Sequence, residues 1–174
     1  MTIRKILTEP NKLLRQISKS VETVGEEEQK LMDDMLETMY EAPGIGLAAV
    51  QIGVPKRIIV MDIGRDENNK EPRFFVNPVI KNKNEVKSIY EEGCLSVPDQ
   101  FAEIERPNSC EVEYLDYDGK QQLLKAEGLL ATCIQHEMDH LEGILFIDYL
   151  SKLKKSMIVK KLSKQKKSLE RIVV

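Results

Sequence analysis

Apolar and polar positions recur along this chain with two periods, and the period distinguishes helices from strands. Residues 26–42 carry apolar side chains at intervals of three and four, which predicts an amphipathic helix that ends before Pro43. Residues 129–141 have the same period and are followed by Gly143, a residue typical of the position just after a helix. A third helical pattern, with apolar residues among many lysines, occupies residues 151–174.

The segments between the first two helices are shorter and alternate with period two or are continuously apolar, which predicts strands. They are residues 57–62, 73–80, 86–90, 101–105, 110–115 and 121–126. Residues 117–120 carry an Asp-Gly pair and predict a hairpin turn between the last two. The strands do not alternate with helices. The sequence therefore predicts an α+β fold, with antiparallel or mixed sheets around a central helix, an N-terminal helix and a long C-terminal helix.

The composition is that of an ordinary globular protein, with 41% hydrophobic and 32% charged residues in 174. We expect one domain over residues 1–174. Three cysteines are too few, and odd in number, for a disulfide framework. No apolar run approaches the roughly 20 residues of a membrane helix, and the first residues lack the apolar stretch of a secretory signal. These observations predict a cytoplasmic protein with no membrane attachment.

Charge is distributed unevenly along the chain. The net charge is −3, yet residues 151–174 hold nine basic residues and one acidic residue, which leaves −11 on the rest. Apolar residues occur at roughly helical spacing among these lysines: Leu150, Leu153, Met157, Leu162 and Leu169. This basic helix either docks on the acidic body with its lysines in water, or serves as an electrostatic arm for a polyanion such as RNA. The acidity of the body argues against binding nucleic acid, DNA included, through any other face.

The chain has only two histidines, and they are four residues apart in the segment 135–140. On a helix, His136 and His140 project from the same face, so both rings can bind one metal ion. Glu137 then lies beside the metal without binding it, which suits a general base that acts on metal-bound water. The alternative is a solvated helix face with two surface histidines.

A catalytic metal usually has three protein ligands, so one is missing from this helix. Phe146 stands where an extended histidine motif has its third histidine, which leaves a cysteine or a carboxylate. Cys133 lies about 10 Å along the helix from the farther histidine, too far for one ion. Cys110 falls on the inward face of a predicted strand. Cys94 follows a strand end beside the flexible Gly93, and it is the ligand that the sequence predicts.

Two other functions remain open at this point. A zinc endopeptidase would use a carboxylate as its third ligand, either Asp148 or Glu170. A non-enzymatic module would combine a structural metal with RNA binding by the basic tail. Such a site requires a closed shell of four ligands, and a fourth ligand is hard to find in this sequence.

Three segments, taken together, resemble the peptide deformylase family. Residues 44–51 (GIGLAAVQ), 92–96 (EGCLS) and 135–140 (QHEMDH) are similar in order and spacing to its three signature motifs. The resemblance covers essentially the whole chain, and Pro98 and the C-terminal helix are similar to the bacterial type with a helical tail. It implies a hydrolase that removes the formyl group from the N-terminal formylmethionine of nascent polypeptides. The products would be formate and a free N-terminus.

The resemblance also implies the metal chemistry. Cys94, His136 and His140 would hold one divalent ion, and Glu137 would act as the acid and base. In this family the native ion is Fe²⁺, nickel and cobalt are working substitutes, and zinc is usually poor. Any of these ions could occupy the purified protein, because one thiolate and two imidazoles do not select among them.

Further residues are implied for the substrate. The Gln51 side chain and the Leu95 backbone N–H would form the oxyanion hole. The expected substrate-binding residues are Gly44, Ile45, Gly46, Glu92, Gly93, Leu129, Thr132 and Cys133. Two positions depart from common members, with Thr132 in place of a larger aliphatic residue and Phe101 in place of arginine. The expected partners are formyl-methionyl nascent peptides and, through the basic helix, the ribosome near its exit tunnel.

Overall fold

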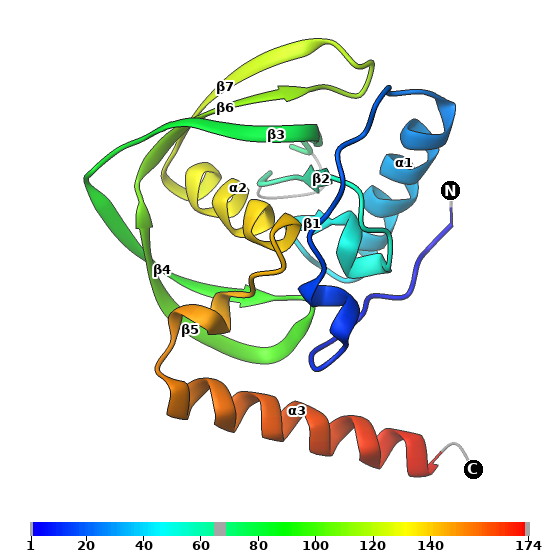
Figure 1. Cartoon of the computed structure of the whole chain (residues 1–174), viewed down its shortest axis with the longest axis vertical. Coiled ribbons are helices and arrows are strands. Elements are labelled where there is room, and N and C mark those ends of the chain that lie inside the picture. Colours follow the sequence, from blue (N-terminus) through cyan, green and yellow to red (C-terminus); the bar gives the residue numbers. More distant parts are fainter. Residues whose placement is uncertain (1, 65–68, 173–174) are drawn as a thin grey trace.

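The computed structural model describes residues 2–64 and 69–172 (Figure 1). Helices and strands follow one another along the chain as η1 (Lys12–Arg15), α1 (Glu26–Glu41), β1 (Gly46–Ala48), η2 (Ala49–Ile52), β2 (Ile58–Met61), β3 (Arg73–Lys83), β4 (Lys87–Cys94), β5 (Val97–Pro107), β6 (Ser109–Leu115), β7 (Gln121–Glu127), α2 (Gly128–Leu141), η3 (Phe146–Tyr149) and α3 (Lys152–Ile172). None of the described helices combines the length and the apolar composition that crossing a bilayer requires.

The strands form two antiparallel sheets, with helix α2 between them (Figure 1). The larger sheet has the order β1-β2-β3-β6-β7, and the smaller one is the hairpin β4-β5. Buried residues of α2 such as Ile134 pack against residues of the larger sheet such as Phe75 and Val112. The predicted α+β architecture, with a central helix and helices near both ends, is confirmed.

Helix α1 covers the other face of the larger sheet. Three of its methionines, Met32, Met35 and Met39, are fully buried against strand residues that include Ile58 and Val60. Unbranched methionine side chains fill irregular space in a core. These residues therefore build the core of the fold and lie away from the histidine helix.

Helix α3 packs with only part of the apolar set that the sequence predicts. The contact with β5 and η3 is made by Leu162, Ile158 and Val159. Leu153 and Met157, which belong to the predicted apolar stripe, are 71% and 63% exposed. The predicted helix is confirmed, but of the predicted apolar set only Leu150 and Leu162 lie in this contact, where Ile158 and Val159 join them.

Two local features differ from the prediction. The short edge strand β1 was expected only as a small apolar segment. Strand β4 continues to Cys94, whereas the sequence predicted that this strand ends at residue 90. Pairing explains both differences, since Gly46 pairs with Met61 of β2, and Gly93 pairs with Phe101 of β5. The pairing shifts register between Gly93 and Cys94, so the hairpin closes at the cysteine.

Candidate metal centre

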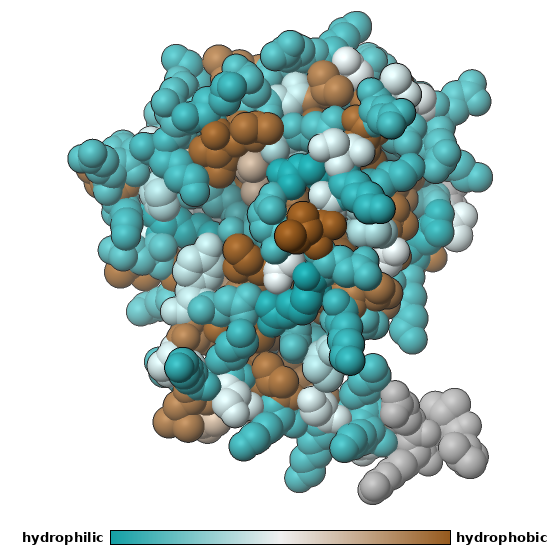
Figure 2. All heavy atoms as spheres, viewed as in Figure 1, coloured by the Kyte–Doolittle hydropathy of each residue, from teal (hydrophilic) through white to brown (hydrophobic). Residues whose placement is uncertain are grey.

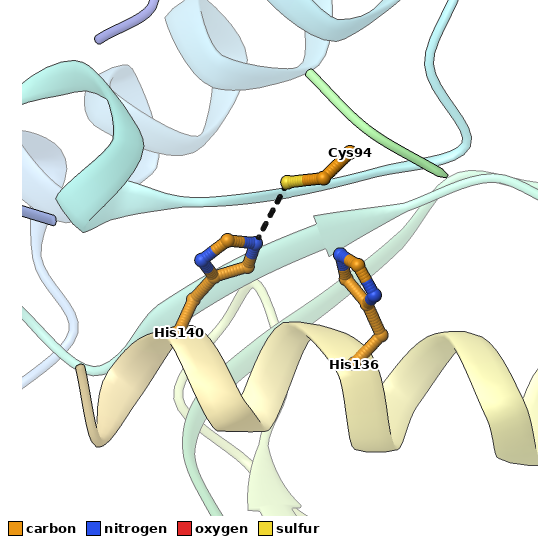
Figure 3. A group of neighbouring side chains, drawn as sticks. All are labelled: Cys94, His136 and His140. Carbon is orange, nitrogen blue, oxygen red and sulfur yellow. Dashed lines mark hydrogen bonds between the residues drawn. The ribbon is translucent and has the colours of Figure 1, made fainter. Parts of the chain in front are cut away.

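Two secondary-structure elements bring three potential ligands together. His136 and His140 project from one face of α2, and Cys94 reaches them from the end of β4 (Figure 3). Their ligand atoms all lie within 4.8 Å of one another, and Cys94 Sγ is 3.3 Å from His140 Nε2. Bonds of about 2.0 Å to nitrogen and 2.3 Å to sulfur place the ligands of one ion at such separations. The thiol and the two imidazoles therefore fit a single transition-metal ion.

Glu92 sets the orientation of one imidazole. Its Oε2 lies 2.8 Å from His136 Nδ1. A carboxylate only accepts hydrogen bonds, so Nδ1 carries the proton and the lone pair of Nε2 is directed toward Cys94 and His140. Burial by itself would raise the pKa of Glu92, but the hydrogen bonds from His136 and Arg106 outweigh burial and lower it. Glu92 therefore stays ionised.

Arg106 completes this support, and the sequence motifs did not indicate it. The guanidinium is buried and donates to both Glu92 oxygens, from Nε at 2.6 Å and from Nη2 at 3.0 Å. Nη1 donates to Asp139 at 2.8 Å, and the Tyr149 ring lies 4.9 Å from the guanidinium carbon. The only sequence signal is its position two residues after Ile104, which puts Arg106 on the apolar face of an alternating strand, where a buried guanidinium requires carboxylate partners.

Glu137 points into the site without a partner. Its side chain is buried, and Oε2 makes no hydrogen bond to any described residue. Burial, its largest cause, raises the pKa of Glu137 to about 7. A carboxyl group with such a pKa can both accept and release a proton near neutral pH. The chain therefore places a proton carrier beside the three ligands.

Hydrogen bonds fix the orientation of the Gln51 amide beside the three potential ligands. Its Oε1 accepts from the Ala48 N–H at 2.8 Å, which turns the amide nitrogen toward the site. Nε2 donates to Ser96 Oγ at 3.0 Å and lies 3.6 Å from Cys94 Sγ. The neighbouring Leu95 packs so closely over Gly44 that a β-carbon there would lie 2.7 Å from Leu95 Cδ1.

A cavity of about 560 Å³ opens beside the three ligands. Most residues predicted from the motifs line it: Gly44, Ile45, Gly46, Gln51, Glu92, Gly93, Cys94, Leu95, Leu129, Cys133, His136 and Glu137. Ile45 and Leu129 are each 45% exposed, so they lie at its mouth and not in a closed core. Thr132 is buried on α2 and is not part of the lining. The cavity also includes Val97 to Phe101, of which the sequence analysis named only Pro98 and Phe101.

The carboxylate alternatives for a third ligand do not lie in this group. Asp148 is engaged elsewhere, with Arg15 at 2.5 Å and Lys155 at 2.6 Å. The side chain of Glu170 lies outside the described residues. Among the described residues, Cys94 is the group that joins the two histidines. A three-ligand centre beside a cavity, with an unpartnered glutamate, is that of a metal-dependent hydrolase.

Comparisons with known proteins identify the family within this class. The profile of the polypeptide deformylase family matches residues 3–156, and the chain belongs to this family. It is 82% identical to the peptide deformylase of Pelagibacter ubique (strain HTCC1062) over 174 residues, which is 100% of both chains. It is 55% identical to that of Rhizobium meliloti (strain 1021) over 168 residues, 97% of each.

Solved structures agree. The crystal structure of peptide deformylase from Ehrlichia chaffeensis superposes with a TM-score of 0.92 at 42% identity, covering 96% of this chain and 98% of that one. The structure of the Ehrlichia chaffeensis enzyme in complex with actinonin gives 0.89 at 46% identity, covering 95% and 98%. The chain is thus an enzyme that removes the N-formyl group from nascent peptides in a metal-dependent reaction. The predicted family, fold and activity are confirmed.

Proposed function

We propose that Cys94, His136 and His140 hold one divalent ion at which Glu137 and Gln51 act on the formyl group of N-formylmethionyl chains. The observation that carries this proposal is the convergence of three ligand atoms within 4.8 Å beside a buried, unpartnered carboxylate. We propose Fe²⁺ as the native ion, as the family resemblance implies, with nickel and cobalt as active substitutes that the mixed thiolate and imidazole set also accommodates.

The residues of the chain divide the reaction between them. The bound ion supplies Lewis acidity and lowers the pKa of a water molecule toward neutrality. Glu137 takes up a proton at Oε2, its free oxygen, and later delivers it to the leaving amine. The Gln51 amide and the Leu95 backbone N–H donate to the oxygen of the formyl group as charge develops on it. Because Ala48 fixes the Gln51 amide beforehand, these donors require little reorganisation.

Strand β1 offers a place for the peptide backbone. It is an edge strand of the larger sheet, with β2 on one side, so an extended peptide can pair with its other side. Gly44 and Gly46 have no β-carbon that would obstruct that backbone. The methionine side chain then enters the cavity between Leu129 and Cys133 of α2, with Ile45 at the mouth.

The test is an anaerobic assay of formate release from an N-formylmethionyl tripeptide. Protein loaded with Fe²⁺ or Ni²⁺ is compared with Glu137→Gln, which should retain the ion and lose at least about 100-fold in kcat. Glu85→Gln, an exposed glutamate in the loop before β4, is the matched control. Cys94→Ser should lose most of its metal, whereas Cys110→Ala should keep it. Full activity in Glu137→Gln would contradict the proposal.

We further propose a cytoplasmic enzyme of one domain, residues 1–174, that contacts the ribosome near the exit tunnel through α3. The support is the cluster of exposed lysines on this helix, since basic side chains bind RNA phosphates in a salt-dependent way. Deleting α3 would also remove Leu162 from the core, so charge reversal is the sharper test. Lys160, Lys164 and Lys167 changed to Glu should abolish pelleting with ribosomes.

The control for that experiment carries the same three charge reversals on the body, at Lys12, Lys30 and Lys120, which are all exposed. Pelleting that survives the α3 substitutions, or that is lost equally in the control, would overturn the ribosome contact.

A further inference from the structure

A second groove, of about 840 Å³, runs between the hairpin β4-β5 and helix α3. The hairpin side is formed by Glu91 and residues 100–103, and the helix side by residues of one face of α3. On the face of the molecule shown in Figure 2, brown side chains occur in small separate patches among hydrophilic ones. The apolar side chains on this face therefore form no broad continuous surface.

The groove is continuous with the cavity of the metal centre. Three residues, Glu91, Gln100 and Phe101, line both. Phe101 is 67% exposed, and its ring lies over Gly93, where a β-carbon would be only 2.6 Å from Phe101 Cε1. An exposed aromatic ring thus stands at the junction of cavity and groove.

The walls of the groove carry opposite charges. Lys154 and Lys161 lie on the α3 side, and Glu91 and Glu103 lie on the hairpin side. Within the described part of the chain, none of these four side chains has an ion-pair or hydrogen-bond partner. The space between the walls is apolar at Met157, which is 63% exposed. Unpaired charges along an apolar floor suit a ligand with both apolar and polar groups.

The length of the groove matches a short stretch of extended chain. Lys154 and Lys161 are seven residues apart on a helix, a distance of about 10 Å along its axis. Residues 100–103 of β5 span a similar length. An extended polypeptide rises about 3.3 Å per residue, so about three residues fit beside α3.

We propose that this groove binds the nascent chain downstream of the residues held at the metal centre. The inference rests on the proposed function, because a formylated polypeptide with its N-terminus at Glu137 must leave the cavity at its open rim. Glu91, Gln100 and Phe101 form part of that rim and begin the groove. Helix α3 is then a part of the substrate-binding surface, in addition to any contact with other partners.

The test compares two substrates that share their first three residues, an N-formylmethionyl tripeptide and a nonapeptide that extends it. Binding three further residues should raise kcat/KM for the nonapeptide about five-fold in the unmodified protein, mainly through KM. In Met157→Glu the ratio of the two values should fall toward one. Leu153→Glu introduces the same charge on the same helix outside the groove, and it should keep the ratio of the unmodified protein.

The possible results of this experiment distinguish failure of the groove assignment from failure of the proposed function. Equal kcat/KM for the two peptides in the unmodified protein would overturn the groove assignment and leave the proposed function intact. A ratio that falls equally in Leu153→Glu would also overturn it, since that result would reflect charge on α3 in general. Absence of formate from both peptides would overturn the proposed function and the groove with it.

Discussion

Gly46 and Glu137 approach each other so closely that a methyl group on Gly46 would overlap the Glu137 carboxylate. A β-carbon at this glycine would lie 2.8 Å from Glu137 Cδ and closer still to Oε1. Strand β1 therefore passes directly over the part of helix α2 that carries Glu137. The absence of a side chain at Gly46 therefore leaves the space that the buried Glu137 carboxyl group occupies.

The first prediction follows from this approach. Gly46→Ala should displace the Glu137 carboxyl group and lower kcat/KM about 100-fold, because small misplacements of a reacting group have effects of that size. Formate release measures activity, and metal content should remain unchanged because the three ligands are not touched. Gly25→Ala is the control, since a β-carbon there meets only Glu28 Oε2 at 3.7 Å. Undiminished activity in Gly46→Ala would contradict the assigned role of Glu137.

The second prediction concerns the support of His136. Glu92→Gln places an amide group where Arg106 donates to both oxygens, so one of these bonds is lost. Removing such support from a ligating histidine typically lowers metal affinity about 10–100-fold. Competition with a chelator should show faster metal loss in this variant. Glu105→Gln, an exposed glutamate paired with Lys87, is the control, and equal rates in both variants would refute the role of Glu92.

The third prediction separates the roles of the two polar atoms of the Gln51 amide, the oxygen Oε1 and the nitrogen Nε2. Gln51→Glu keeps an oxygen that accepts from the Ala48 N–H but removes the amide donors. Loss of one oxyanion donor should lower kcat about 10²–10³-fold. The formate assay with metal-loaded protein measures this loss, and Gln165→Glu on the exposed face of α3 is the control. A loss of stability with full activity per folded molecule would indicate that Gln51 is only structural.

The fourth prediction is a dependence of stability on pH. Burial would raise the pKa of Asp148, but Lys155, the Leu145 N–H and Arg15 outweigh burial and lower it. A carboxylate with a lowered folded-state pKa stabilises above its unfolded pKa of about 3.9, and this contribution disappears as the pH falls through the folded value. Asp148→Asn should therefore cost about 2 kcal/mol at pH 7 and progressively less below pH 4.

Urea unfolding at pH 7 and pH 3 measures both values for Asp148→Asn. Asp118→Asn is the control, because its ion pair with Lys120 is long, at 3.9 Å, and exposed. Its free energy of unfolding should change by no more than about 0.5 kcal/mol. An Asp148→Asn cost that is the same at both pH values would show that the charge of Asp148 does not contribute.

Local sequence patterns were sufficient to predict those helices and turns that form from neighbouring residues. The helix around His136 is set by apolar periodicity, and the hairpin turn at Asp118 and Gly119 is set by turn chemistry. The partner of Glu92 could not be predicted in this way, because Arg106 is on the neighbouring strand and contacts it only through pairing of β4 with β5. The face by which α3 packs was predicted only in part. Leu162 lies in the cluster with Ile104 and Phe146 as the spacing of the leucines predicts, but the packing against this cluster also uses Ile158 and Val159.

Two of the three proposed ligands come from helix α2 and the third from the hairpin β4-β5, which are far apart in the sequence. An ion bound by Cys94 and His140, as proposed, would close a loop of 46 residues, as a cross-link would. Every gain in ion affinity is then also a gain in resistance to heat and proteolysis. The identity of the ion in the proposed site would therefore set how long the folded molecule persists as well as how fast it turns over.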